Sequence, residues 1–100
     1  MKVITLCGST KFETKYREIN EKLTLEGNVV FSCGVFKFKD ANKENKRELL
    51  QEIHRKKIDM SDEIFVINVG GYIGEHTAEE IEYALKTGKK INYLEMKKEK

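Results

Sequence analysis

Short runs of β-branched and other apolar residues alternate along this chain with longer segments of helical period. The short runs end at Gly or polar residues, which is typical of buried strands, and they are Val3–Cys7, Asn28–Phe31, Glu63–Val69 and Ile91–Leu94. The longer segments predict helices that begin at Thr10, near Lys46 and at Thr77. Because parallel strands need a crossover, which is usually a helix, this order predicts a parallel sheet.

Right-handed crossovers place the helices on both faces of such a sheet. The predicted fold is therefore α/β, a three-layer flavodoxin-like or Rossmann-like sheet of about four strands in the order 2-1-3-4. A chain of 100 residues has the usual size of one domain. We expect that domain to span residues 1–96, with a charged tail at 97–100.

The helical periods also predict which side chains face the core. The residues expected to point inward, or to lie beside the inner face, are Phe12, Tyr16, Ile19 and Leu23 in the first helix, Leu49, Leu50, Ile53 and His54 in the second, and Ala78, Ile81 and Leu85 in the third. In the first helix, Thr10 and Glu13 have the spacing of a capping box.

The composition limits the classes of partner. Lys and Arg number 19 against 17 Asp and Glu, a net charge of +2, so we expect no nucleic-acid binding. No apolar run approaches the length of a membrane span, and no signal peptide is seen, so we expect a cytoplasmic protein without membrane contact. Cys7 and Cys33 lack metal-ligand spacing and are predicted to be reduced thiols. With only two His, no metal site or cofactor is expected.

Ligands of doubly wound sheets bind where the strand order reverses, at the carboxyl ends of the strands. Here that point lies between the first and third strands. The loops predicted to meet there are 8–11 and 69–77, with 32–38 alongside. They contribute the candidate substrate-binding residues Gly8, Ser9, Thr10, Lys11, Gly34, Gly70, Gly71, Gly74, His76 and Thr77.

The turn at Cys7–Lys11 joins a strand to a helix start. Its backbone N–H groups, two hydroxyls and Lys11 suit an anion at the positive end of a helix. The alternative is an ordinary helix cap, with Gly8 making the turn and Thr10 the capping box. Tyr72 and Ile73 leave a similar choice, because they could cover a planar base or close over the edge of the core.

Glu80 and His54 are the candidate catalytic residues. Thr77-x-x-Glu80 can be read as a capping box, but Glu80 also shares a helical stripe with Thr77 and Ala84, at the edge of the buried face. An ionised carboxylate there could act as a nucleophile or stabilise a developing sugar cation. His54 could be a hydrogen-bonded boundary residue, although its ordinary pKa suits proton transfer near neutral pH. Asp62, before the third strand, is expected to order the turn.

Three stretches carry a resemblance to a known superfamily: Leu6–Thr10, Asp62–Ile67 and, most specifically, Gly74–Ala84 with its Thr-Ala-x-Glu-Ile-x-Tyr-Ala pattern. The chain resembles the nucleoside 2-deoxyribosyltransferase-like superfamily, which includes deoxynucleotide N-hydrolases. It looks closest to a short branch of that superfamily known as a domain of unknown function. The resemblance spans nearly the whole chain.

The resemblance implies that Glu80 is the nucleophile that attacks C1′ of a deoxyribonucleoside. It also implies that Gly8, Ser9 and Lys11 hold the sugar or its 5′-phosphate. The base would be displaced and the sugar then transferred to a second base or to water. Where the family has an active-site Asp, this sequence has His54, and the signature's two Gly positions hold His76 and Glu82.

The sequence therefore leaves two alternative functions. The first is an enzyme that cleaves or transfers the N-glycosidic bond of a (deoxy)nucleoside or its monophosphate. The second is a non-catalytic module that binds a nucleotide or a nucleotide-derived signal on the same fold. A homodimer or larger homo-oligomer is expected by family analogy, and because a four-stranded sheet leaves open edges.

Overall fold

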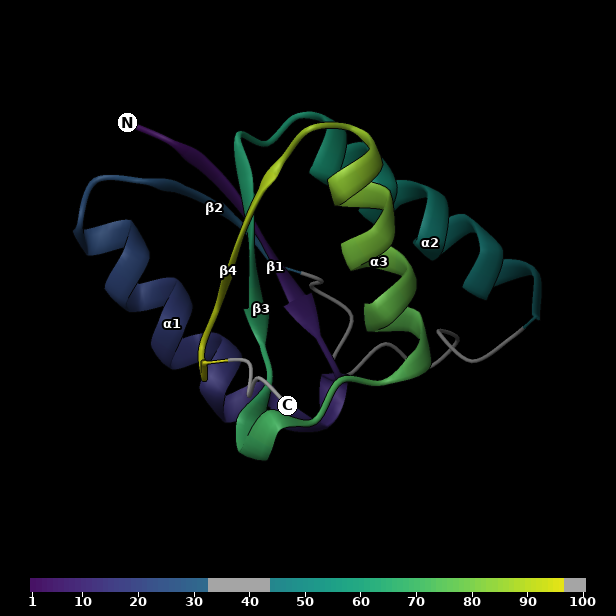
Figure 1. Ribbon diagram of the computed structural model, residues 1–100, viewed down its shortest axis with the longest axis horizontal. Coiled ribbons are helices and arrows are strands. Elements are labelled where there is room, and N and C mark those ends of the chain that lie inside the picture. Colours follow the sequence, from purple (N-terminus) through teal and green to yellow (C-terminus); the bar gives the residue numbers. More distant parts are fainter. Residues whose placement is uncertain (33–43, 97–100) are drawn as a thin grey trace.

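The computed structural model describes residues 1–32 and 44–96, and within them the chain forms one parallel sheet (Figure 1). The sheet contains β1 (Val3–Gly8), β2 (Val29–Phe31), β3 (Glu63–Ile67) and β4 (Lys90–Tyr93) in the order β2-β1-β3-β4. Ile4 pairs with Glu63 and Gly8 with Ile67, so the two central strands run side by side over most of their length. The predicted strand order is confirmed.

In the described part of the chain, helices cover both faces of this sheet (Figure 1). On one face lies α1 (Glu13–Leu25), and on the other lie α2 (Glu44–Asp59) and α3 (Glu75–Lys86). Successive side chains of β1 point to opposite faces of the sheet. Ile4 and Leu6 join the core under α1, whereas Cys7 joins the core under α2 and α3. The three-layer prediction is thus confirmed.

The predicted inner face of α1 is confirmed, but the helix begins later than expected. Tyr16, Ile19 and Leu23 are buried. Ser9, rather than Thr10, is the capping residue, because its Oγ accepts from the Lys11 N–H at 3.3 Å. The Phe12 N–H donates to the Ser9 carbonyl at 3.1 Å and closes a 3₁₀ turn at Thr10–Phe12. Because α1 starts only at Glu13, the predicted Thr10 capping box is wrong.

The inner faces of α2 and α3 are rotated from the predicted ones. Leu49, Ile53 and Leu85 are 45%, 42% and 62% exposed, and Ala78 is also exposed. His54, one of the predicted positions, is buried together with Ile58 in α2, and the buried positions in α3 are Thr77 and Ala84. The predicted Leu50 and Ile81 are partly buried. One reason is that β1 turns a partly polar face toward these helices. Thr5 Oγ1 bonds the Lys57 carbonyl and the Ser61 hydroxyl there, at the end of α2.

The chain after β3 turns earlier than predicted. The strand ends at Ile67, and Val69–Gly71 form a 3₁₀ turn. The Gly71 N–H donates to the Asn68 carbonyl at 2.8 Å and closes this turn. The buried Asn68 side chain bonds both the N–H and the carbonyl of Glu95. None of the helices in the described ranges combines the length and apolar character that a membrane crossing requires.

Candidate functional site

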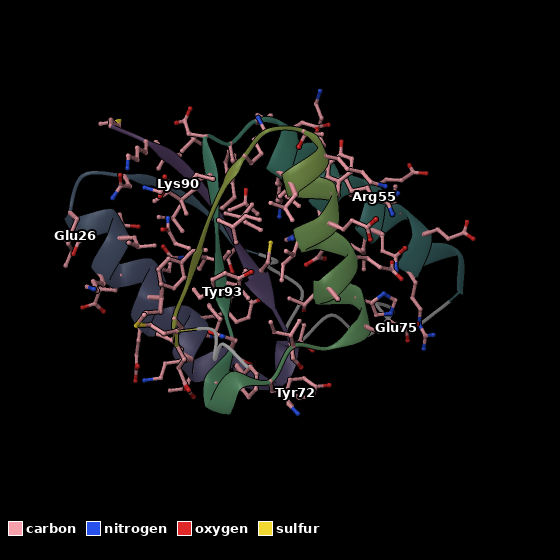
Figure 2. The ribbon with its side chains drawn as sticks, viewed as in Figure 1. Glu26, Arg55, Tyr72, Glu75, Lys90 and Tyr93 are labelled. Carbon is pink, nitrogen blue, oxygen red and sulfur yellow. The ribbon has the colours of Figure 1, made fainter. Side chains whose placement is uncertain are left out.

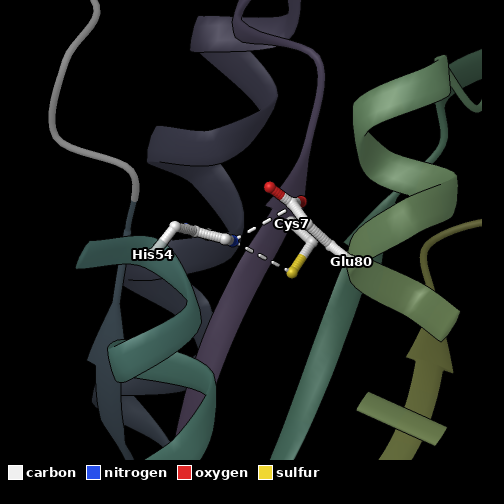
Figure 3. A group of neighbouring side chains, drawn as sticks. All are labelled: Cys7, His54 and Glu80. Atoms are coloured by element: carbon white, nitrogen blue, oxygen red, sulfur yellow. Dashed lines mark hydrogen bonds and ion pairs between the residues drawn. The ribbon is translucent and has the colours of Figure 1, made fainter. Parts of the chain in front are cut away.

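Cys7, His54 and Glu80 converge from β1, α2 and α3 (Figure 3). Cys7 lies on the face of β1 that looks toward α2 and α3, because it alternates with Leu6, which faces α1. His54 lies one helical turn before Ile58, the residue that anchors α2 on the sheet. Glu80 precedes the buried Ala84 by one turn of α3. Three separate packing contacts therefore bring these side chains together.

A single nitrogen of His54 makes both contacts in this cluster. Nε2 lies 3.4 Å from Cys7 Sγ and 3.5 Å from Glu80 Oε1, and the three groups' ligand atoms lie within 4.8 Å of one another. In a Cys-His-carboxylate relay, the thiol and the carboxylate occupy different ring nitrogens. The arrangement here is convergent, so it does not have the geometry of a cysteine-protease triad.

Solvent reaches the three members unequally. Cys7 is fully buried and His54 is 9% exposed, whereas the Glu80 side chain is 23% exposed. Glu80 is therefore the member that a solute can reach directly. An incoming reactant would meet the carboxylate first, with the imidazole behind it and the thiol at the base of the cluster.

The start of α3 removes the local explanation for Glu80. The helix begins at Glu75 with Gly74 as its N-cap, and no side chain of the described residues caps it. Thr77 is the third residue of the helix and is buried, so the capping-box interpretation of Thr77 and Glu80 is wrong. The predicted stripe is present, with Thr77 and Ala84 buried and Glu80 partly buried.

A comparison with solved structures finds the same fold in a known enzyme. The chain superposes on a 2-deoxyribosyltransferase from the psychrotolerant bacterium Bacillus psychrosaccharolyticus with a TM-score of 0.72 and 18% sequence identity, over 91% of this chain and 70% of that one. The protein has a nucleoside 2-deoxyribosyltransferase-like fold. No protein-family model matches the sequence, and a search of curated proteins finds no match either.

In this 2-deoxyribosyltransferase-like fold, the first turn meets the loop after β3, as predicted. Lys11 Nζ lies 3.6 Å from the centroid of the Tyr72 ring, and Phe12 packs edge-on against the same ring with centroids 6.0 Å apart. Figure 2 places Tyr72 at the end of the sheet where the strands finish. A cation and two aromatic rings therefore lie side by side at the edge where ligands of this fold class bind.

Gly8 has a packing role. A Cβ at Gly8 would lie 2.8 Å from the Ile67 carbonyl oxygen, and its φ is +154°. The hydroxyl of Tyr16 also donates to the Gly8 carbonyl at 2.7 Å. Close approach of β1 and β3 thus requires glycine here, whether or not the turn contacts a ligand.

The remaining candidates lie in different surroundings. His76 is exposed, and its Nδ1 contacts Gln51 Nε2 at 3.3 Å, which links α3 to α2 outside the cluster. A Cβ on Gly74 would approach the Tyr72 hydroxyl at 3.2 Å, whereas Gly70 and Gly71 have open space around that position within the described structure. Gly34 lies outside the described residues, as does Cys33. Asp62 has a structural role, as expected, but its Oδ2 accepts from the Val3 N–H at 2.8 Å and so holds the start of β1.

Cys7 was not among the site residues predicted from the sequence. The spacing of the Cys residues and the small number of His argue against a local metal motif, but they say nothing about residues that meet from three different elements. The signal that points to Cys7 is the alternation along β1, which puts it on the same face as Thr5 and under α2 and α3.

Proposed function

We propose that this protein cleaves or transfers the N-glycosidic bond of a deoxynucleoside or its monophosphate, with Glu80 as the nucleophile and His54 as the proton donor. The observation that carries the proposal is the 3.5 Å contact between His54 Nε2 and Glu80 Oε1. It joins a solvent-accessible carboxylate to a buried imidazole, on a fold also found in a 2-deoxyribosyltransferase.

The reaction would proceed in two displacements. A Glu80 carboxylate oxygen attacks C1′, the bond from C1′ to the base nitrogen breaks, and its electron pair leaves with the base. Protonated His54 gives the Nε2 proton to the leaving base, which departs neutral, and the sugar remains as an ester on Glu80. Water or a second base then attacks C1′ and returns a proton to His54, which regenerates the free carboxylate.

The Ser9–Lys11 turn and Tyr72 support the substrate assignment. The Lys11 ammonium lies over the Tyr72 ring, so a cation suited to a phosphate lies beside a ring on which a base can stack. The amide groups in the first turn of α3, whose N-cap Gly74 has no side-chain acceptor in the described structure, add hydrogen-bond donors for a sugar hydroxyl or a phosphate.

The test is incubation with a panel of deoxynucleosides and deoxynucleoside monophosphates, with chromatography of the released base. Glu80→Gln should abolish release because an amide is a poor nucleophile. Glu79→Gln is the matched control, since Glu79 is exposed on the same helix, and it should release base at the wild-type rate. Equal release by wild type and Glu80→Gln would remove Glu80 from the mechanism.

The second candidate function is a nucleotide-binding module without catalysis. The observation that favours it is His54, which stands where the superfamily that the sequence resembles has a carboxylate. Thermal stabilisation by one compound of the panel, with no base released, would support this function over the enzyme. We also propose, from the sequence resemblance, that the protein forms a homodimer or larger homo-oligomer, which sedimentation equilibrium would test.

A further inference from the structure

The Cys7, His54 and Glu80 cluster presents three different metal-ligand atoms to one point. They are a sulfur, an imidazole nitrogen and a carboxylate oxygen, all within 4.8 Å of one another. We propose that this cluster binds a divalent cation of the zinc class, with Cys7 Sγ, His54 Nε2 and Glu80 Oε1 as ligands. We further propose that the metal-bound protein is inactive as a glycosidase, a consequence that rests on the proposed function.

The distances are close to those of a tetrahedral zinc site. With Zn–S near 2.3 Å and Zn–N near 2.0 Å, the tetrahedral angle separates sulfur and nitrogen by about 3.5 Å, and nitrogen and oxygen by about 3.3 Å. The observed separations are 3.4 Å for Cys7 Sγ to His54 Nε2 and 3.5 Å for His54 Nε2 to Glu80 Oε1. The remaining separation, between Cys7 Sγ and the Glu80 carboxylate oxygen, is within 4.8 Å. The Glu80 side chain is partly exposed, so it can rotate to shorten this distance.

The convergence on one nitrogen separates this arrangement from a proton relay. A metal requires all ligand lone pairs to face one point, and His54 turns the same atom toward both the thiol and the carboxylate. Once Nε2 has lost its proton, its lone pair is directed into the space between them. Figure 3 shows the three side chains meeting at their tips from β1, α2 and α3.

The ligand types select the metal. Thiolate and imidazole favour Zn²⁺ and similar transition metals over Mg²⁺ and Ca²⁺, which prefer oxygen. Three protein ligands leave a fourth position for water, as in catalytic rather than structural zinc sites. The thiolate and the carboxylate together carry two negative charges, so binding of a dication with loss of the thiol proton leaves a neutral site, which suits its burial.

Metal binding and glycosidic cleavage would compete for the same atoms. A Glu80 oxygen that coordinates the metal is not available to attack C1′, and a coordinated His54 Nε2 has no proton to donate. One bound cation would therefore remove both the nucleophile and the acid, and the metal would act as a switch on the proposed reaction.

The test titrates the metal-free protein, residues 1–100, with Co²⁺ as the spectroscopic probe, followed by competition with Zn²⁺. The expected result is one equivalent of Co²⁺ bound, with thiolate-to-cobalt charge-transfer absorption and intense tetrahedral bands that Zn²⁺ abolishes. Cys7→Ser should remove the charge-transfer absorption, and Cys33→Ser is its matched control and should retain it. Glu80→Gln and His54→Ala should weaken binding by more than about tenfold, whereas Glu79→Gln should not.

Circular dichroism of the metal-free variants shows whether each is folded, and the wild-type melting temperature provides a measurement that needs no variant. One equivalent of Zn²⁺ should raise it, because the metal binds the folded cluster. No cobalt absorption in the wild type, or absorption lost in Cys33→Ser and kept in Cys7→Ser, would overturn the site. Full base release by a protein that shows the cobalt spectrum would overturn the switch. A metal-free protein that releases no base contradicts the proposed function and leaves the site standing.

Discussion

His54 Nε2 on α2 lies 3.5 Å from Glu80 Oε1 on α3, and this contact crosses the layer above Cys7. Neither α2 nor α3 could form this contact by itself, because each helix contributes one of the two side chains. The pair forms because both helices are anchored on the sheet one turn beyond these residues, at Ile58 and Ala84, which are fully buried. The chemistry proposed here depends on that relationship.

His54→Ala should lower the rate of base release by about 10²- to 10⁴-fold, the usual contribution of a positioned general acid. The loss should be greatest for bases that leave poorly as anions, because these depend most on the proton. The measurement is the release rate across a series of bases with different leaving-group acidity. A loss that is the same for every base would assign His54 to positioning alone.

Gly8→Ala should destabilise the protein more than Gly70→Ala does. Both glycines have a positive φ, but a Cβ at Gly8 would lie 2.8 Å from the Ile67 carbonyl oxygen, whereas a Cβ at Gly70 would have no described atom within 4 Å apart from its own chain neighbours. We expect a loss of about 1–2 kcal/mol at Gly70 from backbone conformation, and a further 1–3 kcal/mol or so at Gly8 from overpacking. Urea unfolding of the two variants measures the difference, and equal losses would contradict the packing argument.

Asn68→Ala should lower the free energy of unfolding by about 1–3 kcal/mol for the backbone groups it leaves unpaired. The Asn68 amide holds both the N–H and the carbonyl of Glu95, at 2.9 and 3.0 Å. Asn20→Ala is the control, because among the described residues the Asn20 side chain accepts just one bond, from Thr24 at an exposed place on α1. A control loss as large as that of Asn68→Ala would show that the Glu95 contacts contribute little.

The Tyr83 phenol should titrate above its ordinary pKa of 10.0, chiefly because its hydroxyl donates a hydrogen bond to Asp59, with burial and the Asp59 charge adding to the effect. The folded state then holds the phenol proton more tightly than the unfolded chain does. The resulting stabilisation is complete below the unfolded pKa and is lost as the pH rises through the folded value.

Ultraviolet titration of tyrosinate in wild type and in Tyr83→Phe isolates this group by difference. Asp59→Ala should bring the Tyr83 pKa down toward 10.0, because it removes both the hydrogen-bond acceptor and the charge. A Tyr83 pKa that Asp59→Ala leaves unchanged would contradict the assigned cause.

The fold could be predicted from the sequence because buried parallel strands appear as apolar runs and crossovers are right-handed. The inner faces of α2 and α3 could be predicted only in part, at His54 and Ile81. Ile53 and Leu85 are apolar yet exposed, and on the α2 side Thr5 bonds Ser61 while Cys7 contacts His54. The spacing of apolar residues along a helix does not predict these polar contacts.

The candidate site divides in the same way. The edge of the sheet, Glu80 and His54 were candidates from the sequence, and the structure brings the two side chains together. Cys7 was not predicted as a site residue, because its role depends on how β1 packs against α2 and α3. That packing joins elements far apart in the chain, so no local sequence motif predicts it.

The most direct test of the central claim is mass spectrometry of the protein, acid-quenched soon after mixing with a deoxynucleoside that it cleaves. The account predicts a covalent adduct of one deoxyribosyl group on the peptide that contains Glu80, present in Glu79→Gln and absent in Glu80→Gln. Base release without any adduct on that peptide, at quench times shorter than one turnover, would contradict a Glu80 nucleophile.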